Sequence, residues 1–68
     1  MTEEFKQFLA TIREGERKGH IKTSKPLTDF DIAVQFAIGK LGDEQGYPLS
    51  ATPGEIQEAI IKHCGNVL

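Results

Sequence analysis

The chain has 68 residues, a formal net charge of −2, 38% hydrophobic side chains and one cysteine. A chain this short buries only about 60% of the surface of its unfolded form, so we expect one marginally stable domain covering residues 1–68. A lone cysteine cannot close an intrachain disulfide, which argues against a disulfide-stapled secreted protein and favours the reducing cytoplasm. No apolar run approaches the length of a membrane span and the first residues lack a signal-peptide pattern, so we expect no membrane partner.

The first predicted helix spans about residues 2–18. Thr2 can cap its first turn, and Gly19 can end it. Gly15 costs about 1 kcal/mol of helix stability relative to alanine, so we expect the last turn to fray. The apolar side chains recur at the i, i+3, i+4, i+7 spacing of one helical stripe, formed by Phe5, Phe8, Leu9 and Ile12.

The second predicted helix begins after Thr28, its N-cap, and is expected to end at Gly42, with Gly39 permitting a close helix crossing. Ile32 and Phe36 lie off its main apolar stripe, on a second face. Only two other helices and a loop are available to cover that face, and an exposed apolar patch usually marks an interaction site. We therefore predict self-association or partner binding through Ile32 and Phe36. The main stripe comprises Phe30, Ala33, Val34, Ala37, Ile38 and Leu41.

The third predicted helix, residues 53–64, has the clearest start signal in the chain. Thr52 is an N-cap candidate, Pro53 suits the first helical position, and Glu55 can reach back to the cap to complete a capping box. Gly65 can end the helix.

Three helices around one core make the predicted fold class all-α, a small three-helix domain. The two connecting segments leave room for a short pair of extended segments. One would lie within residues 20–23, and the other would carry Tyr47 and Leu49 toward the core.

Charge is distributed unevenly along the chain. Residues 1–25 hold six basic and four acidic side chains, whereas residues 26–68 hold two basic and six acidic ones. The segment 13–25 is the candidate for a nucleic-acid contact, because flexible basic side chains bind phosphates without base specificity. No aromatic side chain is interleaved for base stacking, which makes a solvated surface the favoured alternative. The five candidate residues are Arg13, Arg17, Lys18, Lys22 and Lys25.

The stretch from Ile32 to His63 resembles the first half of winged-helix domains, with a helix, a Gly-Tyr-Pro-Leu-Ser segment and a capped helix. The resemblance implies DNA binding. In that family a further helix enters the major groove and a β-wing follows, and these 68 residues offer a counterpart to neither. The connecting loop of about ten residues also exceeds the three or four of a helix-turn-helix, so we do not expect base reading by this route.

The residues that carry metal or catalytic chemistry are sparse. His63 and Cys64 are adjacent, so they point about 100° apart on a helix and cannot easily share an ion with His20. No nucleophile motif surrounds Cys64, and the glycines form no phosphate-binding loop. We therefore predict no metal, no cofactor and no enzymatic activity.

Two function hypotheses remain open. The first is a non-enzymatic protein-interaction or regulatory module in the cytoplasm, with a protein partner or a second copy bound through Ile32 and Phe36. The alternative is a nucleic-acid-associated protein that contacts phosphates through the basic segment. The salt dependence of binding distinguishes the two hypotheses, because the affinity for phosphates falls steeply as salt is added and the affinity of an apolar contact does not.

Overall fold

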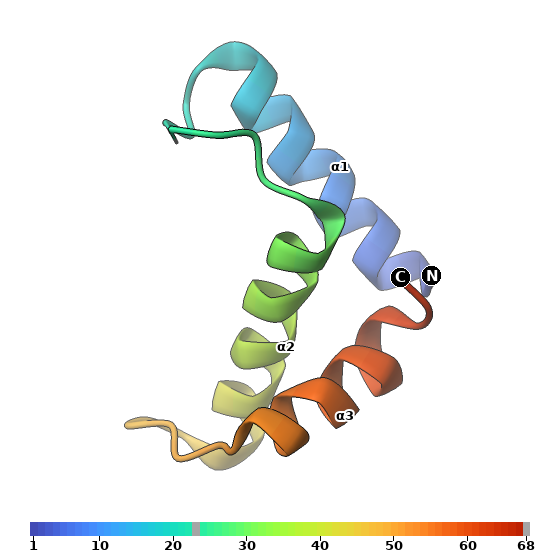
Figure 1. Cartoon of the computed structure of the whole chain (residues 1–68), viewed down its shortest axis with the longest axis vertical. Helices are drawn as coiled ribbons and strands as arrows, with labels where there is room; N and C mark the ends of the chain where they lie inside the picture. Colours follow the sequence, from blue (N-terminus) through green and yellow to red (C-terminus); the bar gives the residue numbers. More distant parts are fainter. Residues whose placement is uncertain (23, 68) are drawn as a thin grey trace.

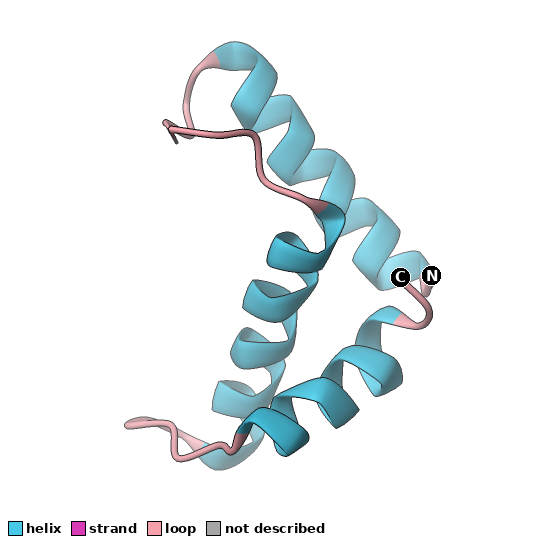
Figure 2. Ribbon diagram, in the orientation of Figure 1, coloured by secondary structure: helices cyan, strands magenta, loops and turns pink. Residues whose placement is uncertain are grey.

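The computed structural model describes residues 1–22 and 24–67 and contains three helices. These are α1 (Glu3–Lys18), α2 (Asp29–Gln45) and α3 (Pro53–Cys64). Figure 1 shows α2 and α3 diverging from the loop that joins them, with α1 closing a triangle behind them. The described residues contain no strand, as Figure 2 shows, so the all-α prediction is confirmed and the pair of extended segments is wrong for those residues.

A threonine begins each helix. Thr2, Thr28 and Thr52 have extended backbone conformations, and each hydroxyl accepts the N–H of the residue three positions later. The predicted capping box of α3 is confirmed: the Glu55 N–H donates to the Thr52 hydroxyl, and the Thr52 N–H donates to the Glu55 carboxylate, both at 3.2 Å. The start of each helix is thus fixed by bonds within four consecutive residues.

The end of α2 differs from the prediction. Gly42 is not a cap but a buried helical residue, and the helix continues to Gln45. The cap is Gly46, whose φ of 80° suits glycine and whose N–H donates to the Gly42 carbonyl at 2.7 Å. Gly42 is covered by Tyr47, which turns back over the helix although its own side chain is 71% exposed. No atom outside the helix backbone lies within 4 Å of a Cβ built at Gly39, so the expected close helix crossing there is absent.

The connector after α1 turns back on the helix instead of running extended. The His20 and Ile21 N–H groups donate to the Gly15 carbonyl at 2.9 and 3.3 Å. The Ile21 side chain packs over Gly15, where a Cβ would lie 2.9 Å from its terminal methyl. These contacts hold the last turn of α1, which the glycine alone would have weakened. The prediction of an extended piece included Thr23, which lies outside the described residues.

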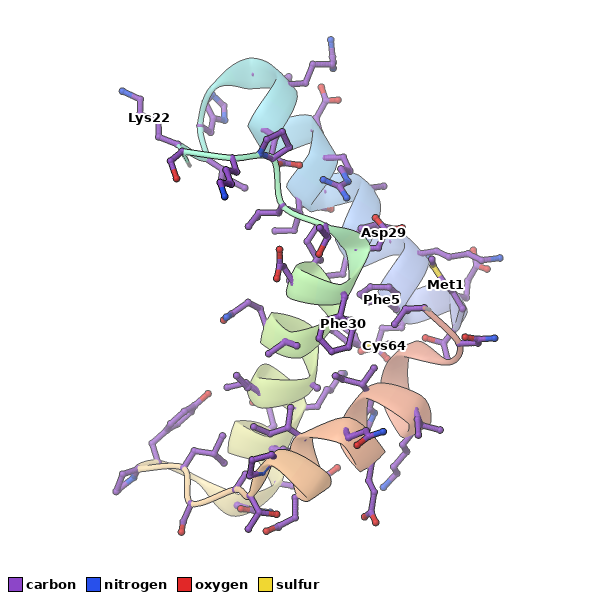
Figure 3. All side chains as sticks on the ribbon, viewed as in Figure 1. Met1, Phe5, Lys22, Asp29, Phe30 and Cys64 are labelled. Carbon is purple, nitrogen blue, oxygen red and sulfur yellow. The ribbon has the colours of Figure 1, made fainter. Side chains whose placement is uncertain are left out.

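The core lies where the three helices meet. Phe5 of α1 is fully buried, and its ring lies 5.5 Å from that of Phe36, which also packs against Phe8 at 5.0 Å. Figure 3 labels Phe5 and Cys64 close to this junction. The buried set consists of Phe5, Ile32, Ala33, Ala37, Leu41, Ala59, Ile60 and Cys64.

Both halves of α1 bond to other parts of the chain. At its start, Thr2 donates its N–H to the Cys64 carbonyl at 2.9 Å and its hydroxyl to the His63 carbonyl at 2.5 Å. In its second half, Arg13 donates to the Asp29 carboxylate and to the Leu27 carbonyl, both at 2.6 Å. The first pair of bonds joins α1 to the end of α3, and the second joins it to the start of α2.

The molecule exposes more surface than a compact protein of the same mass. It exposes 4840 Å², whereas a compact monomer of 7.5 kDa is expected to expose about 4,200 Å². Its radius of gyration is 12.3 Å, compared with about 11 Å for a compact chain of this length. The three helices therefore cover less of one another's surface than the elements of a compact chain of this length would.

Candidate functional site

An apolar groove runs between α2 and α3. It has a volume of about 760 Å³ and opens to solvent along one side, and none of the residues that line it carries an ionisable side chain. Phe30 contributes to it from α2, and Figure 3 shows Phe30 between α2 and the C-terminal half of α3. The other apolar side chains in its wall are Val34 of α2, Pro53, Ile56, Ile60 and Ile61 of α3, and Val67 after α3.

Two large apolar side chains of the groove project into solvent. Phe30 is 44% exposed and Ile61 is 65% exposed, whereas Ile60 beside them is only 5% exposed. Fully burying an apolar side chain of this size stabilises a structure by about 1.5–3 kcal/mol. Because Phe30 and Ile61 are only partly buried, contact with another molecule would gain a substantial part of that free energy. A few hundred Å² of contiguous apolar surface on a small monomer often marks a functional surface.

The sequence prediction placed the uncovered apolar surface on the other side of α2. Ile32 is only 2% exposed, so it is a core residue and offers no surface to a partner. Phe36 is half-buried: Phe5 and Phe8 of α1 pack against its ring, and the Lys40 ammonium lies 5.3 Å from the ring centre. Helix α1 therefore packs on the face that we expected to be free, although Phe36 stays half-buried there. The face left open is the one that carries Phe30.

The sequence carries a signal for the face that is left open. Phe30 and Val34 are four residues apart, and Ile60 and Ile61 are adjacent, so one of those two isoleucines must point away from the core of a short helix. Neither pattern by itself shows which of the apolar faces of α2 is covered by α1. That choice depends on how the helices cross.

Arg13, one of the predicted phosphate ligands, is engaged within the domain. Its guanidinium bonds to Asp29, to the Leu27 carbonyl and, at 2.8 Å, to Glu16. The hydrogen bond to Asp29, followed by that to Glu16, raises the pKa of Arg13. The hydrogen bond from Arg13, together with the Leu27 N–H, lowers the pKa of Glu16. Arg13 thus fastens the connector and the start of α2 to α1.

The other basic residues lie on the end of α1 and on the connector. Arg17 and Lys18 both pair with Glu14, Lys18 at 3.4 Å. Arg17, Lys22 and Lys25 line one shallow hollow of about 510 Å³, together with Glu16. Figure 3 shows Lys22 projecting at the far end of the molecule from Cys64. The structure therefore brings three of the five predicted phosphate ligands together, but with a carboxylate among them.

Cys64 belongs to the core. Its thiol is fully buried and lies 3.8 Å from the Ala33 carbonyl, and burial raises the pKa of the thiol. His63 on the same turn faces Glu44 at 3.5 Å, and His20 is exposed on the connector. Among the described residues, no three His, Cys, Asp or Glu side chains are grouped so that they could hold a metal ion. Within the same residues, no helix combines the length and apolar character needed to cross a bilayer.

No protein-family model, curated protein or solved structure matches the chain. In the described part of the chain, the groove between α2 and α3 and the basic hollow are surface features on which a function can be based.

Proposed function

We propose that this protein is a non-enzymatic interaction module that binds another polypeptide through the groove between α2 and α3. The observation that carries the proposal is the joint exposure of Phe30 and Ile61 on the edge of an uncharged apolar groove. Interface cores are depleted in charged residues, and this lining carries no ionisable side chain.

The openness of the groove favours a polypeptide over a small molecule. Its volume of about 760 Å³ lies within the range of small-molecule sites, but such sites bury about 70–90% of the surface of their ligand. Here Ile61 remains 65% exposed, so the wall that it forms cannot enclose a small molecule. An extended apolar surface between two helices is instead suited to a packed helix or another apolar face.

Affinity capture from the native cell tests the proposal, with a tagged copy of this chain as bait. We expect Ile61→Glu to lose the captured polypeptide, because a carboxylate would be buried in an apolar contact. Ala10→Glu is the matched control, since it adds the same charge at an exposed position of α1. Equal capture by wild type and Ile61→Glu would rule out the groove as the binding surface.

A second candidate function rests on the hollow that Arg17, Lys22 and Lys25 share. Three cations at one hollow could contact a phosphate backbone, although Glu16 lies among them. Titration of DNA or RNA should then shift the NMR signals of these three lysine and arginine residues, and affinity should fall steeply with salt. Shifts centred on α2 or α3 would reject this mode of binding.

We also propose a cytoplasmic location. The support is Cys64, a free and fully buried thiol that suits a reducing compartment. Fractionation of the native cell, with detection of the chain in the cytoplasmic or the extracellular fraction, tests this assignment.

A further inference from the structure

Ser24 lies at the basic hollow formed by the end of α1 and the connector that follows it. Arg17 contributes to the wall of the hollow from α1, and Lys22 and Lys25 contribute from the connector on either side of Ser24 in the sequence. The side chain of Ser24 is exposed, as are those of the three cations. Figure 3 shows Lys22 projecting from the connector at this end of the molecule. A serine hydroxyl that a second protein can reach thus shares one hollow with three positive charges.

The carboxylate of Glu16, which also lines the hollow, is bonded to groups outside it. One of its oxygens accepts a hydrogen bond from Arg13 at 2.8 Å, and the other accepts the Leu27 N–H at 3.1 Å. Neither partner is among the described residues that line the hollow. Those lining residues therefore carry three positive charges and one negative charge, and the negative charge is already paired with Arg13.

Arg17 has a partner of its own in Glu14. Its Nε atom lies 3.1 Å from a carboxylate oxygen of Glu14, and the two side chains are 71% and 45% exposed. An ion pair exposed to this extent stabilises a fold by only about 0–1 kcal/mol. Arg17 can therefore exchange Glu14 for an anion of higher charge at little cost.

A phosphate group on Ser24 would match the charge of the hollow. At pH 7 phosphoserine carries a charge of about −1.5 to −2 and three acceptor oxygens, and beside a basic cluster it forms about one to three charge-assisted hydrogen bonds. Ser50, the other serine of the chain, offers a contrast. It is also exposed in a loop, but no Lys or Arg occurs between Lys40 and Lys62 in the sequence. The sequence around Ser50 therefore provides no cation for a phosphate.

We propose that Ser24 is a phosphorylation site and that Arg17, Lys22 and Lys25 bind its phosphate. The phosphate comes from a nucleoside triphosphate held by a serine kinase. The Ser24 Oγ forms a bond to the γ-phosphorus, the bond from that phosphorus to the β,γ-bridging oxygen breaks, the nucleoside diphosphate leaves, and the hydroxyl proton passes to a base of the kinase. The phosphate then fastens the connector to the end of α1 and draws Arg17 away from Glu14. This inference is independent of the function proposed for the groove.

Mass spectrometry of the chain, isolated from its native cell with phosphatase inhibitors present, tests the modification. We expect a mass increase of one phosphate group and fragment ions that place it on Ser24. Ser24→Ala should abolish this increase, and Ser50→Ala is the matched control that should retain it. An unmodified chain would overturn the inference, as would a phosphate confined to Thr23 or Ser50.

A chain synthesised with phosphoserine at position 24 tests the contact with the cations. Nearby cations favour the dianion, so phosphorus NMR should give a second phosphate pKa below the value of about 6 found for an exposed phosphoserine. Arg17→Gln should raise this pKa, as should urea, which separates α1 from the connector. Lys18→Gln is the control, because Lys18 follows Arg17 on α1 but is not among the described residues that line the hollow. Equal values in the folded chain and in urea would overturn the proposed contact.

Discussion

Gly39→Ala should stabilise the domain, and the structure gives the expected size of the effect. Gly39 lies inside α2, where glycine is about 0.8–1.0 kcal/mol less favourable than alanine. A Cβ built at this position meets nothing within 4 Å, so the substitution neither creates a clash nor fills a cavity. The net change should therefore be close to the intrinsic difference, about 1 kcal/mol in favour of the folded state.

Thermal and urea unfolding, followed by circular dichroism at one fixed protein concentration, measure this gain. For a domain of this size, about 1 kcal/mol corresponds to a rise of about 4–8 °C in Tm. With a urea dependence of about 1 kcal/mol per molar, the midpoint should rise by about 1 M. The concentration must be held constant because association would itself raise the apparent stability.

Gly42→Ala is the matched comparison on the same helix. There a Cβ would lie 2.3 Å from the Tyr47 hydroxyl oxygen and 2.4 Å from the adjoining ring carbon, so the ring has to move away. We expect a smaller gain than at Gly39, and recovery of the full gain when Tyr47→Ala is added. A Gly39→Ala protein that is no more stable than the wild type would refute the reasoning, because it would mean that the Gly39 surface contacts something absent from the monomer.

Three further predictions follow from individual contacts. Thr52→Ala should lower the free energy of unfolding by about 1 kcal/mol through loss of the cap of α3, with Thr52→Ser as the control; an unchanged denaturation midpoint would contradict the cap. Because the hydrogen bond from Arg13 lowers the pKa of Glu16 from its ordinary value, the unfolded chain takes up a proton at Glu16 before the folded chain does as the pH falls. Stability should therefore decrease at acidic pH, and Glu16→Gln should flatten that decrease in unfolding experiments across the acidic range. Cys64 should react with a thiol reagent only when the fold opens, so denaturant should accelerate labelling; native labelling as fast as that of a free thiol would show that the side chain is accessible.

The starts of the helices could be predicted from the sequence because their causes are local. Thr28 and Thr52 each bond within the next three residues, so the signal and the structure occupy the same short segment. The end of α2 could not be predicted in this way, because Gly42 becomes a helical residue beneath Tyr47 instead of a cap. A glycine near the end of an apolar run permits both outcomes, and contact with a later residue decides between them.

The candidate site depended on information that the sequence holds only indirectly. The two apolar faces of α2 were recognised, but the face carrying Ile32 was expected to be open and is the one that α1 covers. Periodicity shows that a face is apolar and does not show which neighbour packs on it. The same holds for Arg13, whose partner Asp29 lies sixteen residues further along the chain. Whether a basic residue is available to a ligand thus depends on contacts formed by the tertiary structure.

The bonds at the two halves of α1 have a consequence for the groove, although α1 does not line it. Arg13 ties α1 to Asp29 at the start of α2, and Thr2 ties it to the carbonyls of His63 and Cys64 at the end of α3. Phe30 is the residue after Asp29, and Gly65, also in the groove wall, is the residue after Cys64. In Figure 1, α1 spans the distance between these two helix ends from behind. The width of that end of the groove is therefore fixed by the length of α1 between its two attachments. Under the proposed function, a change at either attachment should alter binding without altering any residue that lines the groove.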